Sequence, residues 1–351
     1  EKQEIQAFFD VFIDAKEFGS ILQPEKINFD DYIARINDLE SNFNQMDIET
    51  FEVFEYLREI RQLIVQGKML SSQYDVVITN PPYMGAKGMN PKLSDYVKKH
   101  FKDSKSDLFA VFIERCNFYA KNLSFISHVS MHSWMFLSSY EKLRSDMIKN
   151  QMITSILHLG MEAFDGIIGK VVQTVAVNVR KLNINNYKFK GIRLVDYYDS
   201  RRWEKEKQFF NPDNHYVFPG MIYFENIPGC PIAYWASENV IKSFDNLIGQ
   251  KFQAVAGIST GKNEAYIFSW FEINYNDIGF KANMDSKFRP HSKGGEFRKW
   301  YGNRDYIIKY NRNTLEEMRK LPGFRHDGNQ YYFKNLLSWS KVTSSMFSVR
   351  Y

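Results

Sequence analysis

The sequence predicts an α/β protein, with helices and strands alternating in its first half and a mixed α+β, β-rich domain in its second. Strand-like and helix-like segments follow one another from residue 75 to residue 180, which is typical of a doubly wound sheet. Beyond residue 182 the helical periodicity fades, and Pro, Gly and aromatic residues are scattered. The 351 residues, 44% of them hydrophobic, suffice for two domains with sizeable cores. We therefore expect domains at residues 1–186 and 187–351.

The region before the first strand is acidic and predicted to be mostly helical. Residues 4–13 are apolar enough for a buried strand or a helix. Residues 30–39 and 48–69 carry apolar side chains at three- and four-residue spacings with charges between them, which predicts amphipathic helices. Residues 1–70 hold 7 Lys and Arg against 15 Asp and Glu.

The remainder of the first domain alternates strands and helices. The expected strands are residues 75–79, 124–130, 153–159 and 171–179, and the expected helices are residues 93–101, 107–123 and 140–149. Polar Gln173, Asn178 and Arg180 interrupt the apolar pattern of the last strand, which suits an edge or an antiparallel position.

The second domain is expected to be built from short strands. They are predicted at residues 191–198, 221–225, 265–271, 305–310, 331–333 and 347–351, with one helix at 239–247. The sequence stops at Tyr351 within a strand-like run, so we expect this domain to be incomplete.

Charge and cysteine content narrow the partners and the compartment. Residues 181–351 hold 26 Lys and Arg against 17 Asp and Glu, which suits a polyanionic partner, although a solvated basic face explains the count equally well. Cys116 and Cys230 cannot make a disulfide framework and lie in no metal-ligand spacing, which indicates a reducing cytoplasm and no metal site. No apolar run approaches the roughly 18 residues of a membrane span, so no membrane partner is expected.

The sequence Asn80-Pro81-Pro82-Tyr83 follows the first predicted strand directly. Two consecutive prolines fix the backbone and remove two N–H donors, so they make a stiff turn rather than a continued strand. The turn holds the Asn80 amide, the Pro81 carbonyl and the Tyr83 ring at the carboxyl end of a strand, where open α/β sheets bind ligands. Two carbonyl oxygens can accept both N–H groups of an exocyclic amine on a purine, and the ring can stack on the base.

These four residues resemble motif IV of the amino-methyltransferases that methylate adenine N6 with S-adenosylmethionine. Similar strings occur in methyltransferases that act on RNA guanine or on glutamine side chains, so the string alone leaves the substrate open. A Pro-Pro turn without any chemistry is the remaining alternative.

Three other patterns are rejected as sites. Residues 257–263 resemble a phosphate loop but are one residue short and have Asn263 where Ser or Thr would bind magnesium. His128 and His132 flank a strand end with no third ligand in view, so metal binding is not expected. Cys116 lies in an apolar helix and should be inert packing.

Basic and aromatic residues interleave in the carboxyl half, which fits DNA binding because cations position phosphates and rings stack on bases. Aromatic packing in a small β domain competes with this interpretation for any single ring. The candidate DNA-binding residues are Lys87, Lys293, Arg298, Lys299, Trp300 and Arg304.

Five segments of this sequence together resemble the PglX-like adenine-specific DNA methyltransferases of BREX phage-defence systems. They are residues 12–20, 80–85, 257–263, 293–303 and 331–340. The resemblance implies a partial class-I methyltransferase sheet at 1–186, followed by a target-recognition domain at 187–351. No Gly-x-Gly cofactor loop occurs before Asn80. The loop is therefore expected on a preceding piece of a longer protein, and S-adenosylmethionine binding or activity by this chain alone is in doubt.

The resemblance also implies site residues. Asp14, Asn80, Leu108 and Phe109 are expected to border the cofactor, although Leu108 and Phe109 could equally be core residues behind an Asp107 helix cap. Phe164 is a candidate second ring, with Tyr83, against an adenine flipped out of the duplex, although a core phenylalanine is the commoner case.

The function expected from these observations is methyl transfer to adenine N6 in duplex DNA, with other phage-defence proteins as candidate partners. Asn80, Pro81, Pro82 and Tyr83 would be the catalytic residues. The alternative is a non-catalytic DNA-recognition module built on a methyltransferase-like scaffold, which would bind DNA in a salt-dependent way without a cofactor.

Overall fold

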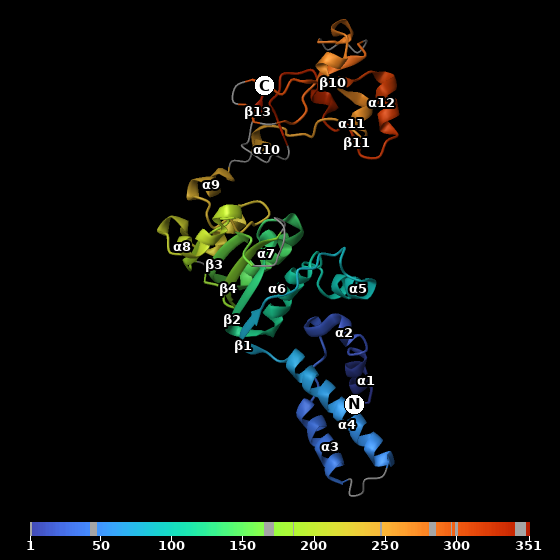
Figure 1. Cartoon of the computed structure of the whole chain (residues 1–351), viewed down its shortest axis with the longest axis vertical. Coiled ribbons are helices and arrows are strands. Elements are labelled where there is room, and N and C mark those ends of the chain that lie inside the picture. The colour runs from blue at the N-terminus through green and yellow to red at the C-terminus, as the bar shows by residue number, and fades with distance from the viewer. Residues whose placement is uncertain are drawn as a thin grey trace. The chain divides into compact units, whose positions relative to one another are not determined.

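The computed structural model divides the chain into two compact units, Glu1–Asn246 and Leu247–Tyr351 (Figure 1). The structure describes residues 2–42, 48–164, 172–184, 186–245, 248–280, 286–295, 297–298, 301–340 and 349–351. Within these residues, no helix is both long enough and apolar enough to cross a membrane.

The first unit begins with helices, as the amphipathic pattern predicts. They are α1 (Lys2–Asp10), α2 (Ala15–Phe18), α3 (Phe29–Asn42) and α4 (Ile48–Ser71). Their apolar faces share one cluster in which Phe8 and Phe29 are buried and their rings lie 5.8 Å apart. Gly67 of α4 lies under the Phe8 ring, and a Cβ there would come within 2.3 Å of it. This glycine therefore permits the close packing of α1 on α4.

Arg115 ties this helical region to the sheet that follows. It lies in α6 (Leu108–Tyr119), is only 1% exposed, and donates hydrogen bonds to the backbone carbonyls of Ser20, Leu22 and Leu70. Its guanidinium also stacks on the Tyr119 ring at 4.2 Å. Its Nη1 has no hydrogen-bond partner, but bonds to three carbonyls offset much of the cost of burying the cation, so Arg115 fixes how these segments pack.

The centre of the first unit is a six-stranded mixed sheet with the order β1-β2-β4-β3-β5-β6. Its strands are β1 (Tyr74–Thr79), β2 (Ala120–Met131), β3 (Met152–Met161), β4 (Gln173–Arg180), β5 (Phe189–Arg193) and β6 (His215–Phe218). β1 pairs with β2, and β3 with β5, in parallel, whereas the other three pairings are antiparallel. The remaining helices are α5 (Pro91–His100), α7 (Glu141–Asn150), α8 (Lys205–Phe209) and α9 (Glu238–Ser243).

β4 is antiparallel, as predicted, but it is not an edge strand, because it lies between β2 and β3. The polar residue that suggested an edge is satisfied across the sheet. The Asn178 amide bonds to Ser127 on one side and to Ser155 on the other. A cross-strand ladder of polar side chains thus replaces the solvent expected for an edge.

The helix predicted at 107–123 ends at Tyr119, and β2 starts with the next residue. Ala120 already pairs with Tyr74 of β1. Pairing in the sheet therefore overrides the helical composition of residues 120–123.

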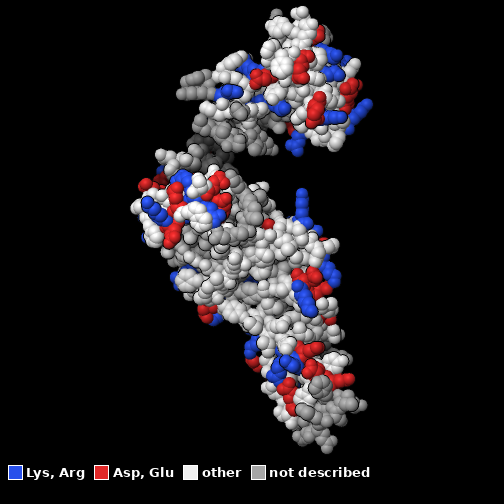
Figure 2. Space-filling view, viewed as in Figure 1, with Lys and Arg blue, Asp and Glu red and all other residues white. Residues whose placement is uncertain are grey.

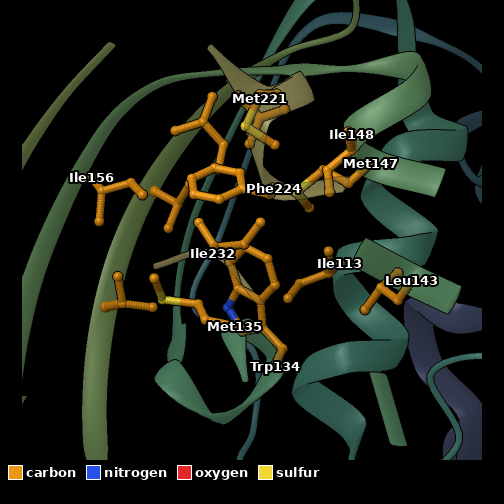
Figure 3. Packing of buried hydrophobic residues seen from close by; sticks show 14 of the residues in the cluster. Ile113, Trp134, Met135, Leu143, Met147, Ile148, Ile156, Met221, Phe224 and Ile232 are labelled. Carbon is orange, nitrogen blue, oxygen red and sulfur yellow. The ribbon is translucent and has the colours of Figure 1, made fainter. Parts of the chain in front are cut away.

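One face of the sheet carries the main core (Figure 3). Ile156 of β3 faces side chains of α6 and α7 such as Ile113 and Met147, with Trp134 and Phe224 between them. Trp134 and Phe224 are fully buried. In the described residues, the opposite face is less covered: Val76 and Ile78 of β1 are 56% and 76% exposed, and Phe125 of β2 is 47% exposed.

The expected domain boundary after residue 186 falls inside this sheet. β5 pairs with β3 from Ser155↔Lys190 to His158↔Arg193, and β6 then pairs with β5. The compact unit accordingly extends to Asn246. The strand predicted at 221–225 is wrong, because Met221–Asn226 form a 3-10 helix that buries Met221 and Phe224.

The second unit is a small mixed α+β assembly. Its main sheet, with the order β8-β10-β9, contains β8 (Ile267–Ser269), β10 (Tyr306–Lys309) and β9 (Phe288–His291). Two short pairs are β7 (Ser259–Thr260) with β11 (Phe324–Arg325) and β12 (Ser338–Trp339) with β13 (Val349–Arg350). The helices are α10 (Ile248–Lys251), α11 (Asn263–Tyr266) and α12 (Arg312–Arg319).

The β-rich character of this unit is as predicted, with local differences. β10 lies within the predicted 305–310 segment. The 265–271 segment begins as the end of α11 before becoming β8, and Asn329–Tyr331 form a 3-10 turn where residues 331–333 were expected to be a strand. Residues 347 and 348 of the last predicted strand lie outside the described residues, and β13 follows them.

Candidate active site

Strand direction gathers several chain segments at one edge of the six-stranded sheet. β1, β2, β3 and β5 run the same way, because β4 is antiparallel to both β2 and β3. Their carboxyl ends therefore meet at one edge. The Asn-Pro-Pro-Tyr turn follows β1 there, His132 follows β2, and the loop with Phe164 follows β3.

Residues 80–84 are irregular backbone that belongs to no helix, strand or assigned turn, and for residues 80–83 we keep the short name 80–83 turn. This segment combines a fixed backbone with an accessible amide. The Pro81 ring is buried, whereas Asn80 and Pro82 are exposed. Within the part of the chain that the structure describes, the Asn80 side chain makes no hydrogen bond. Two prolines hold this side chain at the end of the strand. Because its amide bonds to no described residue, the amide is available to a ligand.

The Tyr83 ring is anchored to the sheet. Its hydroxyl donates to the Val129 carbonyl of β2 at 3.5 Å, and its ring meets Phe109 edge-on with 6.3 Å between centroids. Burial raises the pKa of Tyr83, which a hydrogen bond with the Thr174 side chain partly offsets. The ring is half-buried, so part of its surface stays accessible for stacking.

Asp107 clamps the chain that leaves the turn. Its Oδ1 accepts from the Met84 amide at 3.0 Å and from the Phe109 amide at 3.3 Å, so one carboxylate caps α6 and holds the residue after Tyr83. The Leu108 amide donates to the Met84 carbonyl at 3.0 Å. Burial raises the pKa of Asp107, and the backbone donors counteract that rise. Sequence reasoning identified the cap but missed this contact across 23 residues.

Leu108 and Phe109, the expected cofactor residues beside Asp107, are 7% and 1% exposed. Leu108 packs in the cluster beneath α5, and Phe109 packs in the main core with Tyr140. Both therefore have structural roles behind the turn, and their contact with a cofactor stays a prediction.

Asp14 lies beside the chain that follows the turn. Its Oδ1 pairs with Lys92 Nζ of α5 at 2.7 Å, which raises the pKa of the lysine through that hydrogen bond and the charge attraction. Nearby, Asn90 Nδ2 donates to the Glu17 carboxylate. Asp14 thus has an ionic partner on the protein, and its proposed approach to a cofactor adenine stays a prediction.

Phe164 is 38% exposed in the loop after β3, so it is not a core residue. Residues 165–171, which continue this loop, lie outside the described residues. The exposure of the ring agrees with a contact role, and its stacking on a base stays a prediction.

The two histidines rejected as a metal pair have different partners. His128 is 2% exposed and hydrogen-bonds Ser130, whereas the His132 ring contacts His158 with 2.8 Å between nitrogens. Burial lowers the pKa of His128 and of His132 to about 4, and that of His158 to about 3. All three are neutral near pH 7. Among the described residues, no group of three or more potential metal ligands occurs.

In the second unit, the described candidate DNA-binding residues Lys293, Arg298 and Arg304 lie in the sequence between β9 and β10. Lys293 places its ammonium 4.6 Å over the Tyr306 ring, and exposed Arg304 lies 4.8 Å over the Tyr301 ring. Arg298 is also exposed, as is Lys87 in the first unit. Lys299 and Trp300 lie outside the described residues.

The phosphate-loop-like residues 257–263 run through β7 and a bend at Gly261 into the start of α11. Thr260 is fully buried; its hydroxyl donates to the Asn263 side chain at 2.8 Å and accepts from the Lys262 amide at 3.2 Å. Gly261 has φ +75° and lies against Leu321. Asn263, which stands where the pattern has Ser or Thr, is thus bonded to Thr260 within the segment itself.

Comparison with known proteins shows extended homology. A family model described as Eco57I restriction-modification methylase matches residues 8–164. The adenine-specific methyltransferase PglX of Lacticaseibacillus casei (strain Zhang) is 36% identical over 356 residues, which cover 96% of this chain and 29% of that protein. The adenine-specific methyltransferase BrxX of Escherichia coli O9:H4 (strain HS) is 37% identical over 342 residues, which cover 97% and 28%.

The chain is therefore homologous, over nearly its whole length, to less than a third of each of these two relatives. Among solved structures, a nuclease-deletion mutant of the Type ISP restriction-modification enzyme LlaGI with a DNA substrate mimic has a TM-score of 0.33 at 14% identity, covering 53% of this chain and 20% of that one. That likeness is too distant to support an inference.

Proposed function

We propose that this chain, homologous to part of the adenine-specific methyltransferases PglX and BrxX, carries the amine-binding turn of an enzyme that methylates adenine N6 in duplex DNA. The observation that carries the proposal is the turn itself. Asn80 is exposed at the carboxyl end of β1, and the buried Pro81 next to it fixes the backbone. That geometry, in a chain 36% identical to an adenine-specific methyltransferase, favours adenine over RNA guanine or glutamine.

The two acceptors would orient the amine for attack. Asn80 Oδ1 and the Pro81 carbonyl accept the two N–H groups of adenine N6, which raises electron density on nitrogen and directs its lone pair outward. S-Adenosylmethionine supplies a methyl group on a positively charged sulfur. As the N–C bond forms, the C–S bond breaks with its electron pair on sulfur, and N6 then loses one proton to solvent.

Aromatic rings would hold the flipped base. Tyr83 is anchored on one side by β2 and Phe109, which leaves the ring in a fixed orientation. Phe164, from the loop after β3, is the candidate for the opposite face of the base. Extruding a base costs a few kcal/mol of stacking and pairing, which such ring contacts offset.

The sheet of the first unit would be part of a larger class-I methyltransferase sheet. Apolar Val76 and Ile78 on the edge strand β1 are more than half exposed, which is unfavourable for a solvent-facing edge. We infer that a segment of the parent protein carrying the Gly-rich cofactor loop pairs beside β1. Asp14, Asn80, Leu108 and Phe109 would then contribute to the cofactor pocket it completes.

The second unit would recognise the DNA site. Its exposed cations Arg298 and Arg304, together with Lys293, can contact phosphates, and rings such as Tyr301 can contact bases. By resemblance to PglX-like enzymes, the whole protein would act in phage defence with other proteins of such a system.

The test is product analysis with the full-length protein and methyl-labelled S-adenosylmethionine. We expect the label in N6-methyladenine after enzymatic digestion of duplex DNA, and none with an Asn80→Ala variant that melts at the wild-type temperature. Label in RNA or protein instead would contradict the substrate. Salt-dependent DNA binding without any methyl transfer would favour a non-catalytic recognition module.

A further inference from the structure

The 22 residues between the turn and α6 form a compact basic lobe, which we call the lysine loop (residues 85–106). It contains six lysines and two aspartates. Figure 2 shows basic side chains projecting at the margin where α5, the helix of this loop, lies.

The ends of the lysine loop are joined directly behind Tyr83. Gly85 forms an antiparallel bridge with Asp107, and the Ala86 amide donates to the Ser106 carbonyl at 3.0 Å. With the Asp107 clamp on Met84, these contacts close the loop on itself. Any surface on the loop therefore has a defined position next to the 80–83 turn.

The inner side of the loop is packed, which fixes the direction of its outer side. Leu93, Val97 and Phe101 are buried in one cluster with residues of α6. Tyr96 is stacked between Phe18, at 4.3 Å, and His100, at 4.4 Å. The lysines of the loop are exposed on the remaining surface.

Two of the six lysines have acidic partners: Lys92 pairs with Asp14 at 2.7 Å, and Lys98 pairs with Asp95 at 3.5 Å. The other aspartate of the loop, Asp103, is 3.9 Å from Lys142 outside it. The other four lysines of the loop are Lys87, Lys99, Lys102 and Lys105. Within the described residues, none of these four has an acidic side chain within 4.0 Å.

The arrangement places like charges together. Lys87 and Lys105 are the neighbours in sequence of Ala86 and Ser106, whose backbones are hydrogen-bonded. Two lysines without an acidic partner therefore start from adjacent points of the backbone. Lys99, in the last turn of α5, can be explained by the helix dipole, but Lys87, Lys102 and Lys105 lie outside that helix. Juxtaposed cations raise the free energy of the unbound protein and are relieved by an anionic partner.

We propose that the lysine loop binds the phosphate backbone of DNA beside the target adenine, so that the catalytic unit grips DNA independently of the second unit. This inference rests on the proposed function. A row of point charges on flexible stems suits phosphates, which position the duplex without reading its sequence. The contact would hold the strand while the base leaves the stack.

The test compares two double charge reversals in the full-length protein. Lys102→Glu/Lys105→Glu alters the loop, and Lys188→Glu/Lys190→Glu is the control. Lys188 and Lys190 are exposed at the start of β5. Because β5 is parallel to β3, its start lies at the end of the strands away from the turn. Both changes alter net charge equally. The equilibrium constant for duplex DNA is measured against salt concentration, with melting temperatures to verify folding.

The binding constant falls as salt rises, and each phosphate contact contributes about 0.9 to the steepness of log K against log salt. We therefore expect this dependence to be shallower by about 2 in the loop variant. Binding should weaken equally on target and unrelated sequences, and the control should keep the wild-type slope. If the loop variant keeps that slope while wild-type protein methylates DNA adenine, the inference is wrong and the proposed function stands. If the slope falls but wild-type protein methylates no DNA, the proposed function fails and the loop remains a DNA contact.

Discussion

The 80–83 turn and the 257–263 turn both match ligand-binding patterns in sequence, yet they use their polar groups in opposite ways. Thr260 is fully buried and its hydroxyl is bonded to Asn263 and to the Lys262 amide. Asn80 is exposed, and its amide bonds to no other described residue. A polar group that is hydrogen-bonded within its own segment stabilises the fold. A polar group that is exposed and bonded to no other residue is available for chemistry. Substitutions in the first turn should therefore change rate, and those in the second should change stability.

The largest effect short of removing Asn80 itself is expected at Asp107. Asp107→Ala removes the acceptor that holds Met84 and should lower the methyl-transfer rate about 100-fold, because a displacement near 1 Å at the reacting groups costs that much. Asp107→Asn keeps an oxygen acceptor and should retain most activity. Steady-state kinetics on duplex DNA measure both, and equal losses in the two variants would show that the clamp does not position the turn.

Tyr83 should matter through its ring rather than its hydroxyl. Tyr83→Ala should lower the rate about 10- to 100-fold, because stacking on a base contributes about 1–3 kcal/mol. Tyr83→Phe loses the hydroxyl's bonds to the Val129 carbonyl and the Thr174 side chain but keeps the ring, and should stay within about twofold of wild type. A fluorescent adenine analogue at the target position would report base extrusion. A Phe variant as impaired as Ala would assign the role to the hydroxyl.

Gly261 tests the second turn. A Cβ at this position would lie 2.9 Å from the Leu321 Cβ, and the residue has φ +75°. Gly261→Ala should therefore lower the free energy of unfolding by about 2–4 kcal/mol, from left-handed backbone strain and overpacking. Chemical denaturation measures this loss. The transfer rate of the folded fraction should be unchanged, and a rate defect without a stability defect would reverse the comparison.

Buried histidines give a smaller, pH-dependent effect. Burial lowers the pKa of His128 to about 4 from the ordinary 6.5, so the unfolded state binds more protons as pH falls from about 6.5 to 4. This group should cost about 2 kcal/mol of stability between pH 7 and pH 5. His128→Phe should remove that share of the pH dependence, as measured by unfolding at both pH values. An unchanged pH dependence would show that His128 does not titrate on unfolding in this range.

Features that depend on neighbouring residues could be predicted from the sequence. The apolar run at 75–79 predicts β1 correctly, and the two prolines after it predict where the strand ends, because both depend on adjacent residues. The segment after the strand is irregular backbone rather than the expected turn. The Asp107 cap follows from its place at the start of a helix, and the helices α5 and α7 follow from local composition.

The pairing of strands and the contacts between distant residues could not be predicted from the sequence. β4 lies between β2 and β3 rather than at the edge of the sheet. Its polar Asn178 bonds to a serine on each of these two strands. β5 and β6 are short, and only their pairing with β3 shows that the first unit continues past residue 186. The clamp between Asp107 and Met84 and the closure of the lysine loop likewise depend on contacts between distant residues.

The most direct test of the comparison is the single-turnover methyl-transfer rate, with DNA and methyl donor bound in advance, for Asn80→Ala and Asn263→Ala in the full-length protein. We predict a loss of at least about 100-fold for Asn80→Ala at an unchanged melting temperature, as for a lost transition-state hydrogen bond. Asn263→Ala should melt earlier and react at the wild-type rate. Equal rates for Asn80→Ala and wild type would contradict the account.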